Sequence, residues 1–189
     1  MTFRVFALAV IVGFMLAEAR VSRANARRLR EAGAVEPRGD VYLALALLYP
    51  AAFLLMGFEG LWRASGAGET PAGSPSWDAS GVLLFAASKA LKYWAIRALG
   101  HRWSFHVMVL PGEPLVTAGP YRYVSHPNYI AVVGELVGTA MMMEARVLGP
   151  IMTVAFGLAL WARIRFEARV LAPFRNGSPP AGLDVGGRG

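Results

Sequence analysis

The sequence predicts an all-α integral membrane protein with about five transmembrane helices, the last two forming a helical hairpin. Hydrophobic residues make up 56% of the 189. They gather into apolar runs close to the roughly 20 residues that a helix needs to cross the hydrocarbon core of a bilayer. Basic residues cluster beside these runs, as the positive-inside rule describes. We therefore expect a single membrane domain over residues 1–174, with a disordered Gly/Pro-rich tail over residues 175–189.

The first predicted span covers residues 2–18, and an arginine-rich segment that we interpret as a cytosolic helix follows it to residue 31. A cleaved secretory signal is the alternative for this run. The run lacks a basic leader beyond Arg4, and the basic helix follows where a cleavage site would be needed. We therefore expect a retained span.

Two further spans are expected at residues 41–58 and 80–99, and the third of the series carries Lys89 and Lys92. The segment 65–76 between them is rich in Gly, Ser, Pro and Thr, which predicts a flexible loop.

The second half of the chain begins with a long amphipathic connection, residues 100–128, which has turn signals at Pro111-Gly112 and Gly119-Pro120. Spans over residues 128–143 and 147–163 follow. Only a few residues separate these two runs, so they predict a tight helical hairpin. We expect the 100–128 connection and the C-terminal helix to form a cytosolic cofactor pocket.

The distribution of charge supports this topology. Of the 19 basic residues, 14 fall on one side of the predicted membrane, whereas Arg4, Arg63 and Arg146 fall on the other. This asymmetry places the N-terminus outside and the C-terminus in the cytosol. It also accounts for the net charge of +7, so we expect no nucleic acid partner. With no cysteine and three histidines that lack ligand spacing, we expect no metal site.

Polar residues meet an apolar run at residues 119–129, which read GPYRYVSHPNY. Pro127 suits the first position of a helix, which puts His126 at or near the N-cap. Tyr129 follows three residues later and shares its side of the first turn. A helix N-terminus attracts carboxylate or phosphate groups. An interfacial His and Tyr that anchor the span are the alternative interpretation.

Glu135 lies further into the same predicted span. An unpaired carboxylate there costs about 2.5 kcal/mol or more unless it faces protein or water, which makes Glu135 a functional candidate. A structural ion pair with Lys89 or Lys92 is the alternative.

Arg163 and Glu167 lie four residues apart, on one face of the last predicted helix. A surface salt bridge worth a few tenths of a kcal/mol is one interpretation. In the other, the hairpin returns this pair to the cytosolic end of the span that starts near His126. An Arg, a Glu, a His and a Tyr in one pocket suit a zwitterionic cofactor.

These residues resemble the isoprenylcysteine carboxyl methyltransferase family, whose core reads roughly Gly-Pro-Tyr-Arg-Tyr-x-Arg-His-Pro-x-Tyr, followed by a hairpin that ends in Arg-Ile-x-x-Glu-Glu. The resemblance runs from about residue 92 to 171 and implies S-adenosylmethionine as cofactor, with a lipophilic acceptor that arrives through the membrane. The cofactor-binding residues that it implies are Tyr121, Arg122, His126, Pro127, Tyr129, Glu135, Arg163 and Glu167.

Two positions depart from the family pattern. Ser125 stands where the family usually has Arg, and Ala168 replaces the second Glu. Arg122 or Arg165 are candidates to supply the missing charge. Residues 22–27 and 126–133 also resemble the bacterial branch associated with alkylresorcinols and alkylpyrones. The acceptor is therefore expected to present either a carboxylate, as a prenylcysteine does, or the hydroxyl of a long-alkyl phenol or enol.

The implied mechanism is in-line attack of an acceptor oxygen on the sulfonium methyl, with positioning supplying most of the rate. A carboxylate needs no base. A phenol, with a pKa of about 10, gains from one. Glu167 or His126 is the candidate base, and Arg163 or Arg165 the candidate cation that stabilises the phenolate.

Two other classes of protein remain as alternatives. A membrane sterol-type reductase carries a similar segment and uses a nicotinamide cofactor, but its version continues Tyr-x-Gly-Glu, whereas residues 129–132 here read YIAV. A non-enzymatic membrane scaffold or a small transporter has no use for this arrangement of residues.

Overall fold

The computed structural model describes residues 1–37, 39–66, 75–111 and 113–175. These residues form α-helices and short 3-10 turns, and their one β contact is an isolated bridge between Val35 and Val109. In chain order the elements are α1 (Thr2–Glu31), α2 (Tyr42–Ala64), α3 (Pro75–Leu99), η1 (Gly100–Arg102), η2 (Gly119–Arg122), α4 (Pro127–Met143) and α5 (Leu148–Arg175). The all-helical prediction is confirmed.

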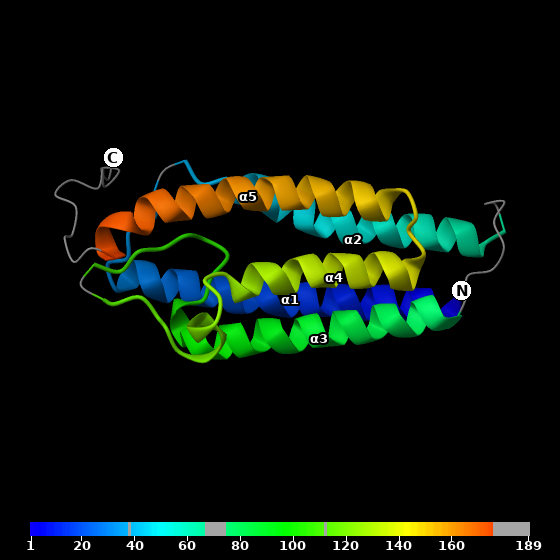
Figure 1. Cartoon of the computed structure of the whole chain (residues 1–189), viewed down its shortest axis with the longest axis horizontal. Coiled ribbons are helices and arrows are strands. Elements are labelled where there is room, and N and C mark those ends of the chain that lie inside the picture. Colours follow the sequence, from blue (N-terminus) through cyan, green and yellow to red (C-terminus); the bar gives the residue numbers. More distant parts are fainter. Residues whose placement is uncertain (38, 67–74, 112, 176–189) are drawn as a thin grey trace.

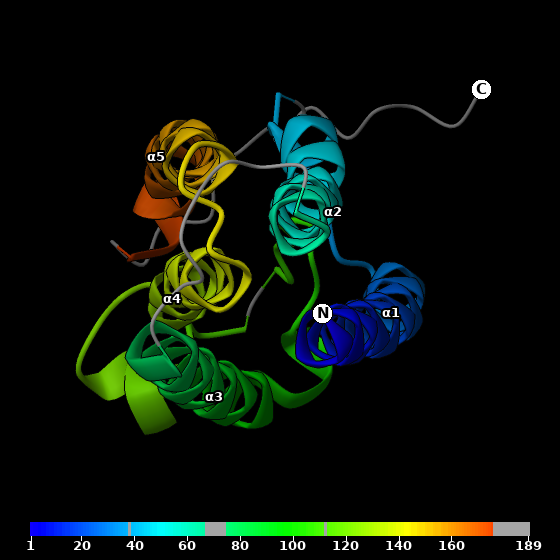
Figure 2. The same cartoon turned by 90° about the vertical axis from the view of Figure 1, so that its right-hand side faces the viewer.

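The five long helices run side by side along the long axis of the molecule (Figure 1). Seen from the end, α4 lies between α3 and α5 and also contacts α2, while α1 packs against α2 (Figure 2). The segments 32–41 and 100–126 and the C-terminal part of α5 all lie at one end of the bundle, the left end in Figure 1. The candidate site is at this end.

Several predicted boundaries differ from the structure. The first apolar run and the arginine-rich segment form one continuous helix, α1. Helix α5 continues to Arg175, the first residue of the predicted tail. Residues 176–189 of the predicted disordered tail, like residues 67–74 of the predicted flexible loop, lie outside the described residues. Residues 75 and 76, the last two of that predicted loop, belong to α3.

Among the described residues, three segments are long and apolar enough to cross a membrane: Thr2–Glu31, Tyr42–Ala64 and Leu148–Val170. Their outer surfaces remain apolar, since Leu47 and Phe58 of α2 and Leu158 of α5 are all more than half exposed. Such apolar outer faces are expected of helices that contact lipid. Helices α3 and α4 are not among the three: α4 has 17 residues, and α3 contains two lysines.

Helices α3 and α4 approach each other closely because glycines line their interface. A Cβ atom added at Gly138 would lie 2.8 Å from the backbone nitrogen of Phe85 and 2.9 Å from the carbonyl oxygen of Gly81. Gly134 lies one turn earlier on α4, and an added Cβ there would meet the Ser88 side chain. Small residues spaced four apart let membrane helices pack backbone to backbone.

The hairpin between α4 and α5 turns at Glu144, which adopts a left-handed conformation with φ of 51°. The start of α5 is then capped from α2: the backbone N–H groups of Val147 and Leu148 donate to the Glu59 carboxylate at 3.1 and 2.7 Å. A carboxylate is favourable at a helix N-terminus because it satisfies free N–H groups and faces the positive end of the helix dipole. Helices α4 and α5 are therefore joined by a short turn and pack against each other.

Candidate active site

The candidate site starts at the N-terminus of α4, where the local sequence determines the geometry. His126 is the N-cap residue, with φ −132° and ψ 59°, and Pro127 occupies the first helical turn as expected. Tyr129 follows in the same turn, and its ring stacks on the His126 ring with centroids 5.2 Å apart and an interplanar angle of 9°. The two parallel rings therefore form one aromatic unit at the N-terminal end of α4.

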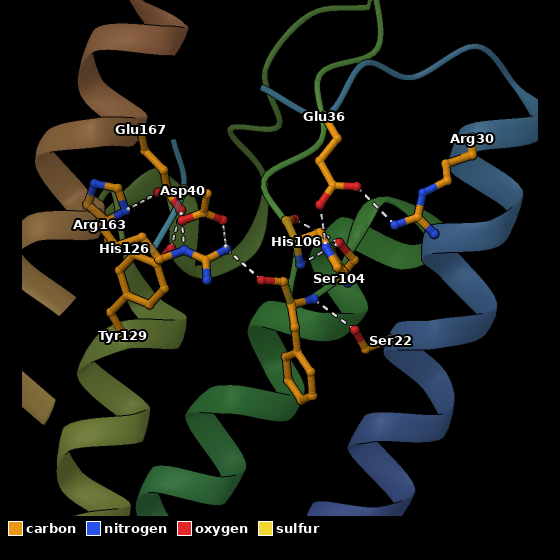
Figure 3. A network of polar contacts seen from close by, with 11 residues as sticks. Ser22, Arg30, Glu36, Asp40, Ser104, His106, His126, Tyr129, Arg163 and Glu167 are labelled. Carbon is orange, nitrogen blue, oxygen red and sulfur yellow. Dashed lines mark hydrogen bonds and ion pairs between the residues drawn. The ribbon is translucent and has the colours of Figure 1, made fainter. Parts of the chain in front are cut away.

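Glu167 of α5 joins this unit to a cation. The Tyr129 hydroxyl donates a hydrogen bond to Glu167 Oε1, and Arg163 Nε donates to the same oxygen at 3.1 Å. The second oxygen, Oε2, lies 3.6 Å from His126 Nδ1. Figure 3 shows the four side chains converging from α4 and α5. The hairpin thus brings together residues that the sequence separates by 38 positions.

Arg163 is itself buried, and its remaining N–H groups reach two further segments. Its Nη2 donates to the backbone carbonyl of Phe105 at 2.5 Å and lies 3.5 Å from Asp40 Oδ2. A buried guanidinium needs several acceptors to offset its lost hydration. Arg163 therefore connects α5 to the loop before α2 and to the 100–118 connection.

Residues 105 and 106 are held by contacts with α1 and with Glu36, on the side away from Arg163 (Figure 3). The Phe105 N–H donates to the Ser22 hydroxyl at 2.8 Å. His106 Nδ1 lies 2.5 Å from Glu36 Oε1, and Arg30 donates to Glu36 Oε2 at 2.9 Å. These contacts anchor to α1 the carbonyl that Arg163 uses.

An open pocket of about 460 Å³ lies against the aromatic unit. Its lining is mostly apolar and comes from the start of α4, the preceding loop and α5: Val124, Ser125, His126, Tyr129, Ile130, Val133, Leu160 and Ile164. Its size falls in the range of small-molecule sites, which are apolar with a few polar groups that orient the ligand.

The other predicted site residues differ in how close they lie to Glu167. Tyr121 in η2 is half-buried, and burial, followed by the Glu167 charge, raises its pKa to about 12. It remains a protonated hydrogen-bond donor at neutral pH. Arg122 and Arg165 are exposed. Arg122 lies 5.8 Å from the Tyr123 ring centroid and Arg165 4.2 Å from that of Trp161. Their described contacts do not include Glu167.

Glu135 belongs to a different group of charges inside the bundle. Its carboxylate pairs with Lys89 at 3.2 Å and Lys92 at 2.8 Å, and both lysines also pair with Glu18 of α1, at 2.6 and 3.1 Å. Tyr49 of α2 donates to Glu135 Oε2 at 2.6 Å and accepts from Lys92 at 2.9 Å. The structure thus places Glu135 in the ion pair that was its alternative interpretation and does not bring it to Glu167.

Asp40 was missed in the sequence analysis. It stands alone between Gly39 and the apolar start of α2, and no spacing rule connects it to Arg163. Its Oδ1 atom is buried without a hydrogen-bond partner, and so is Asn128 Oδ1 in the first turn of α4. Buried acceptors without partners are rare and indicate a missing donor.

These observations fit an amino-acid-like cofactor with N–H and O–H donors. The site offers unpartnered oxygens, two carboxylates and a guanidinium, which suit a ligand that carries both signs of charge. Within the described parts of the chain, no group of three or more His, Cys, Asp or Glu residues is arranged to hold a metal ion.

Fold and site together define a helical membrane protein with a group of charged side chains beside a mostly apolar pocket at one end of its bundle. The model of the isoprenylcysteine carboxyl methyltransferase (ICMT) family matches residues 81–173, which include His126, Tyr129, Arg163 and Glu167. The chain belongs to this family of membrane methyltransferases.

Individual bacterial proteins are also similar to the chain. YpbQ of Bacillus subtilis (strain 168), described as uncharacterized, is 27% identical over 167 residues, covering 88% of this chain and 95% of YpbQ. The cobalt-zinc-cadmium resistance protein CzcN of Cupriavidus metallidurans and the nickel-cobalt-cadmium resistance protein NccN of Alcaligenes xylosoxydans are each 28% identical over 101 residues. The chain spans about half of the latter two, 47% of each.

Proposed function

We propose that this protein transfers a methyl group from S-adenosylmethionine to a carboxylate or a phenolic or enolic oxygen of a lipophilic acceptor. The observation that carries the proposal is the convergence of Tyr129, Arg163 and His126 on the Glu167 carboxylate. This charged group lies beside an apolar pocket and within the segment that the family model matches.

When bound, S-adenosylmethionine supplies an electrophilic methyl: the acceptor oxygen forms the new C–O bond while the C–S bond breaks and its electron pair stays on sulfur. Glu167, His126 and Tyr129, with Tyr121 nearby, are the residues that we propose hold it. A carboxylate near a sulfonium or an ammonium provides electrostatic stabilisation that a preorganised site maintains without rearranging. Arg163 orients the Glu167 carboxylate by its hydrogen bond at 3.1 Å.

A phenolic acceptor gains from a base, and His126 is the better placed of the two candidates. His126 lines the pocket, whereas Glu167 lies behind it with Oε2 3.6 Å from Nδ1. A carboxylate at that position orients the imidazole and stabilises its protonated form after it accepts the phenolic proton. The Arg163 guanidinium contacts Glu167, Asp40 and the Phe105 carbonyl. We therefore propose that its role is to position Glu167. We propose no catalytic role for Arg165, because its described contact is with Trp161.

The apolar lining supports a lipophilic acceptor. Ile130, Val133, Leu160 and Ile164 line the pocket, and Ile130 is 53% exposed on the outside of the bundle. An alkyl or prenyl chain against these side chains buries apolar surface at about 25 cal/mol per Å². Such a contact selects for a long chain and does not depend on the head group.

We further propose that all five helices span the bacterial inner membrane, with the pocket facing the cytosol. Charge supports this orientation: the C-terminal half of α1, the two 3-10 turns and the C-terminal part of α5, which carry most of the arginines, lie at the pocket end of the bundle (Figure 1). Positive residues concentrate on the cytoplasmic side of membrane proteins.

The proposal is tested by comparing lipids from cells with and without the gene by mass spectrometry. We expect a lipophilic species in the deletion strain to be converted, when the gene is restored, to a species heavier by one methyl in place of one hydrogen. Restoration with Glu167→Gln should not convert it. Identical lipid profiles in all three strains, or a product heavier by two hydrogens as a reductase would make, would contradict the proposal.

A further inference from the structure

Asp40 makes only half of the contacts that its carboxylate can make. Its Oδ2 lies 3.5 Å from Arg163 Nη2, and its side chain is 9% exposed. The other oxygen, Oδ1, is fully buried and accepts no hydrogen bond from the described residues. An ionised carboxylate has about four lone-pair positions, and leaving a buried charged acceptor unsatisfied is costly.

The neighbouring charges show which donor would satisfy Oδ1. Asp40 and Glu167 carry two negative charges, and Arg163, which forms an ion pair with each of them, carries one positive charge. These three side chains together therefore carry one negative charge that no positive charge among them balances. A buried group of this kind favours a cationic donor over a neutral or anionic one.

The loop before α2 is shaped to hold Asp40 in this place. Gly39 has φ of +93°, a conformation that side chains rarely adopt, and a Cβ added there would lie 3.5 Å from the Phe166 ring of α5. The loop at Gly39 therefore lies close to α5, one helical turn from Arg163. Asp40 lies outside residues 81–173, so its place in the site comes from the fold of this chain and not from the family match.

We propose that Asp40 Oδ1 binds the α-ammonium group of the amino-acid part of S-adenosylmethionine. This inference rests on the proposed function, since it concerns the same site. Asp40 would then have two roles: Oδ2 positions Arg163, and Oδ1 recognises the ligand. Because an ammonium has three N–H donors and a full charge, it satisfies both the unpartnered oxygen and the missing positive charge.

The experiment measures binding by calorimetry of the full-length protein in detergent, using two ligands. One is S-adenosylhomocysteine, and the other is its analogue without the α-amino group. For the wild-type protein we expect the analogue to bind at least tenfold more weakly. For Asp40→Asn we expect S-adenosylhomocysteine to lose most of that advantage, while the affinity for the analogue changes less than twofold.

Asp78→Asn is the matched control. Asp78 also has a buried Oδ1 without a partner, but it lies in the first turn of α3, at the opposite end of the bundle. It should bind both ligands as the wild type does. If Asp40→Asn does not fold, the comparison of the two ligands on the wild-type protein still tests the recognition of the amino group.

The remaining outcomes separate this inference from the proposed function. If the wild type binds both ligands equally, or if Asp40→Asn weakens both equally, Asp40 acts only through Arg163 and the inference is overturned while the proposed function stands. If the wild type binds neither ligand, the proposed function fails, and this inference with it.

Discussion

The Tyr129 hydroxyl donates a hydrogen bond to Glu167 Oε1 across the α4–α5 hairpin. This contact joins the first turn of one helix to the C-terminal half of the next. The same carboxylate also accepts from Arg163 and faces His126. Because these partners share one carboxylate, variants of each, alone and in pairs, measure how strongly they are coupled.

Tyr129→Phe should weaken binding of S-adenosylhomocysteine about fivefold, because a buried hydrogen bond is worth about 1 kcal/mol and the ring that stacks on His126 remains. Calorimetry measures the affinity. Tyr123→Phe is the control, since Tyr123 is 71% exposed, and its affinity should equal that of the wild type. Equal affinity in Tyr129→Phe would show that the Tyr129 hydroxyl does not contribute to the cofactor site.

Lys92→Met should destabilise the protein by about 3–5 kcal/mol, because it leaves buried carboxylates short of one positive charge. The side chains of Lys92 and Glu135 are 2% and 0% exposed. Adding Glu135→Gln restores neutrality, so the double variant should be more stable than the sum of the single effects indicates. Unfolding in detergent measures this coupling. Additive effects would mean that the two groups do not interact.

Gly138→Ala should destabilise the bundle by about 1–3 kcal/mol, because the new methyl group overlaps the α3 backbone. Gly157→Ala in α5 is the matched control, since nothing lies within 4 Å of its added Cβ. This variant should be neutral or gain up to about 1 kcal/mol from the better helix propensity of alanine. The thermal midpoints of the two variants check the prediction, and equal midpoints would contradict it.

Glu36 should make stability depend on pH in the acid range. Burial raises the pKa of its carboxyl, but the hydrogen bonds and charges of Arg30 and His106 outweigh burial, so the pKa is lowered from 4.5. A lowered pKa in the folded state means that the stabilisation is complete above the unfolded value and is lost as the pH falls through the folded value.

The difference in thermal midpoint between the wild type and Glu36→Gln should therefore be constant near neutral pH and shrink below about pH 4. Glu31→Gln is the control on the exposed surface, with its carboxylate in a solvent-exposed pair with Arg27. A wild-type advantage over Glu36→Gln that persists unchanged at low pH would show that the carboxylate does not titrate as its contacts indicate.

The sequence predicted the helices and part of the site for physical reasons that can be identified. Apolar runs of membrane length mark the helices, and the short connection marks the hairpin, which in turn brings Glu167 to His126. Pro127 marks the start of α4 because its ring favours the first helical turn. These signals are local or depend on one simple geometric rule.

The remaining features depend on tertiary contacts that no local signal reveals. Asp40 reaches Arg163 through a loop conformation at Gly39. Glu18 reads as part of an arginine-rich helix, yet it supplies the second carboxylate to Lys89 and Lys92. The partners of Glu135 were correctly named as an alternative, but the choice between that pair and the cofactor site required the packing of α1, α3 and α4.

The most direct test of the central claim is transfer of label from S-adenosylmethionine that carries a tritiated methyl group. Membranes that contain the wild-type protein, Glu167→Gln or Glu31→Gln are each offered an extracted lipid pool, and NADPH oxidation is followed in parallel. We predict label in the lipid fraction with the wild type and Glu31→Gln, at least a tenfold loss with Glu167→Gln, and no NADPH oxidation. Full methyl transfer by Glu167→Gln with unchanged cofactor affinity, or no transfer by the wild type, would contradict the account.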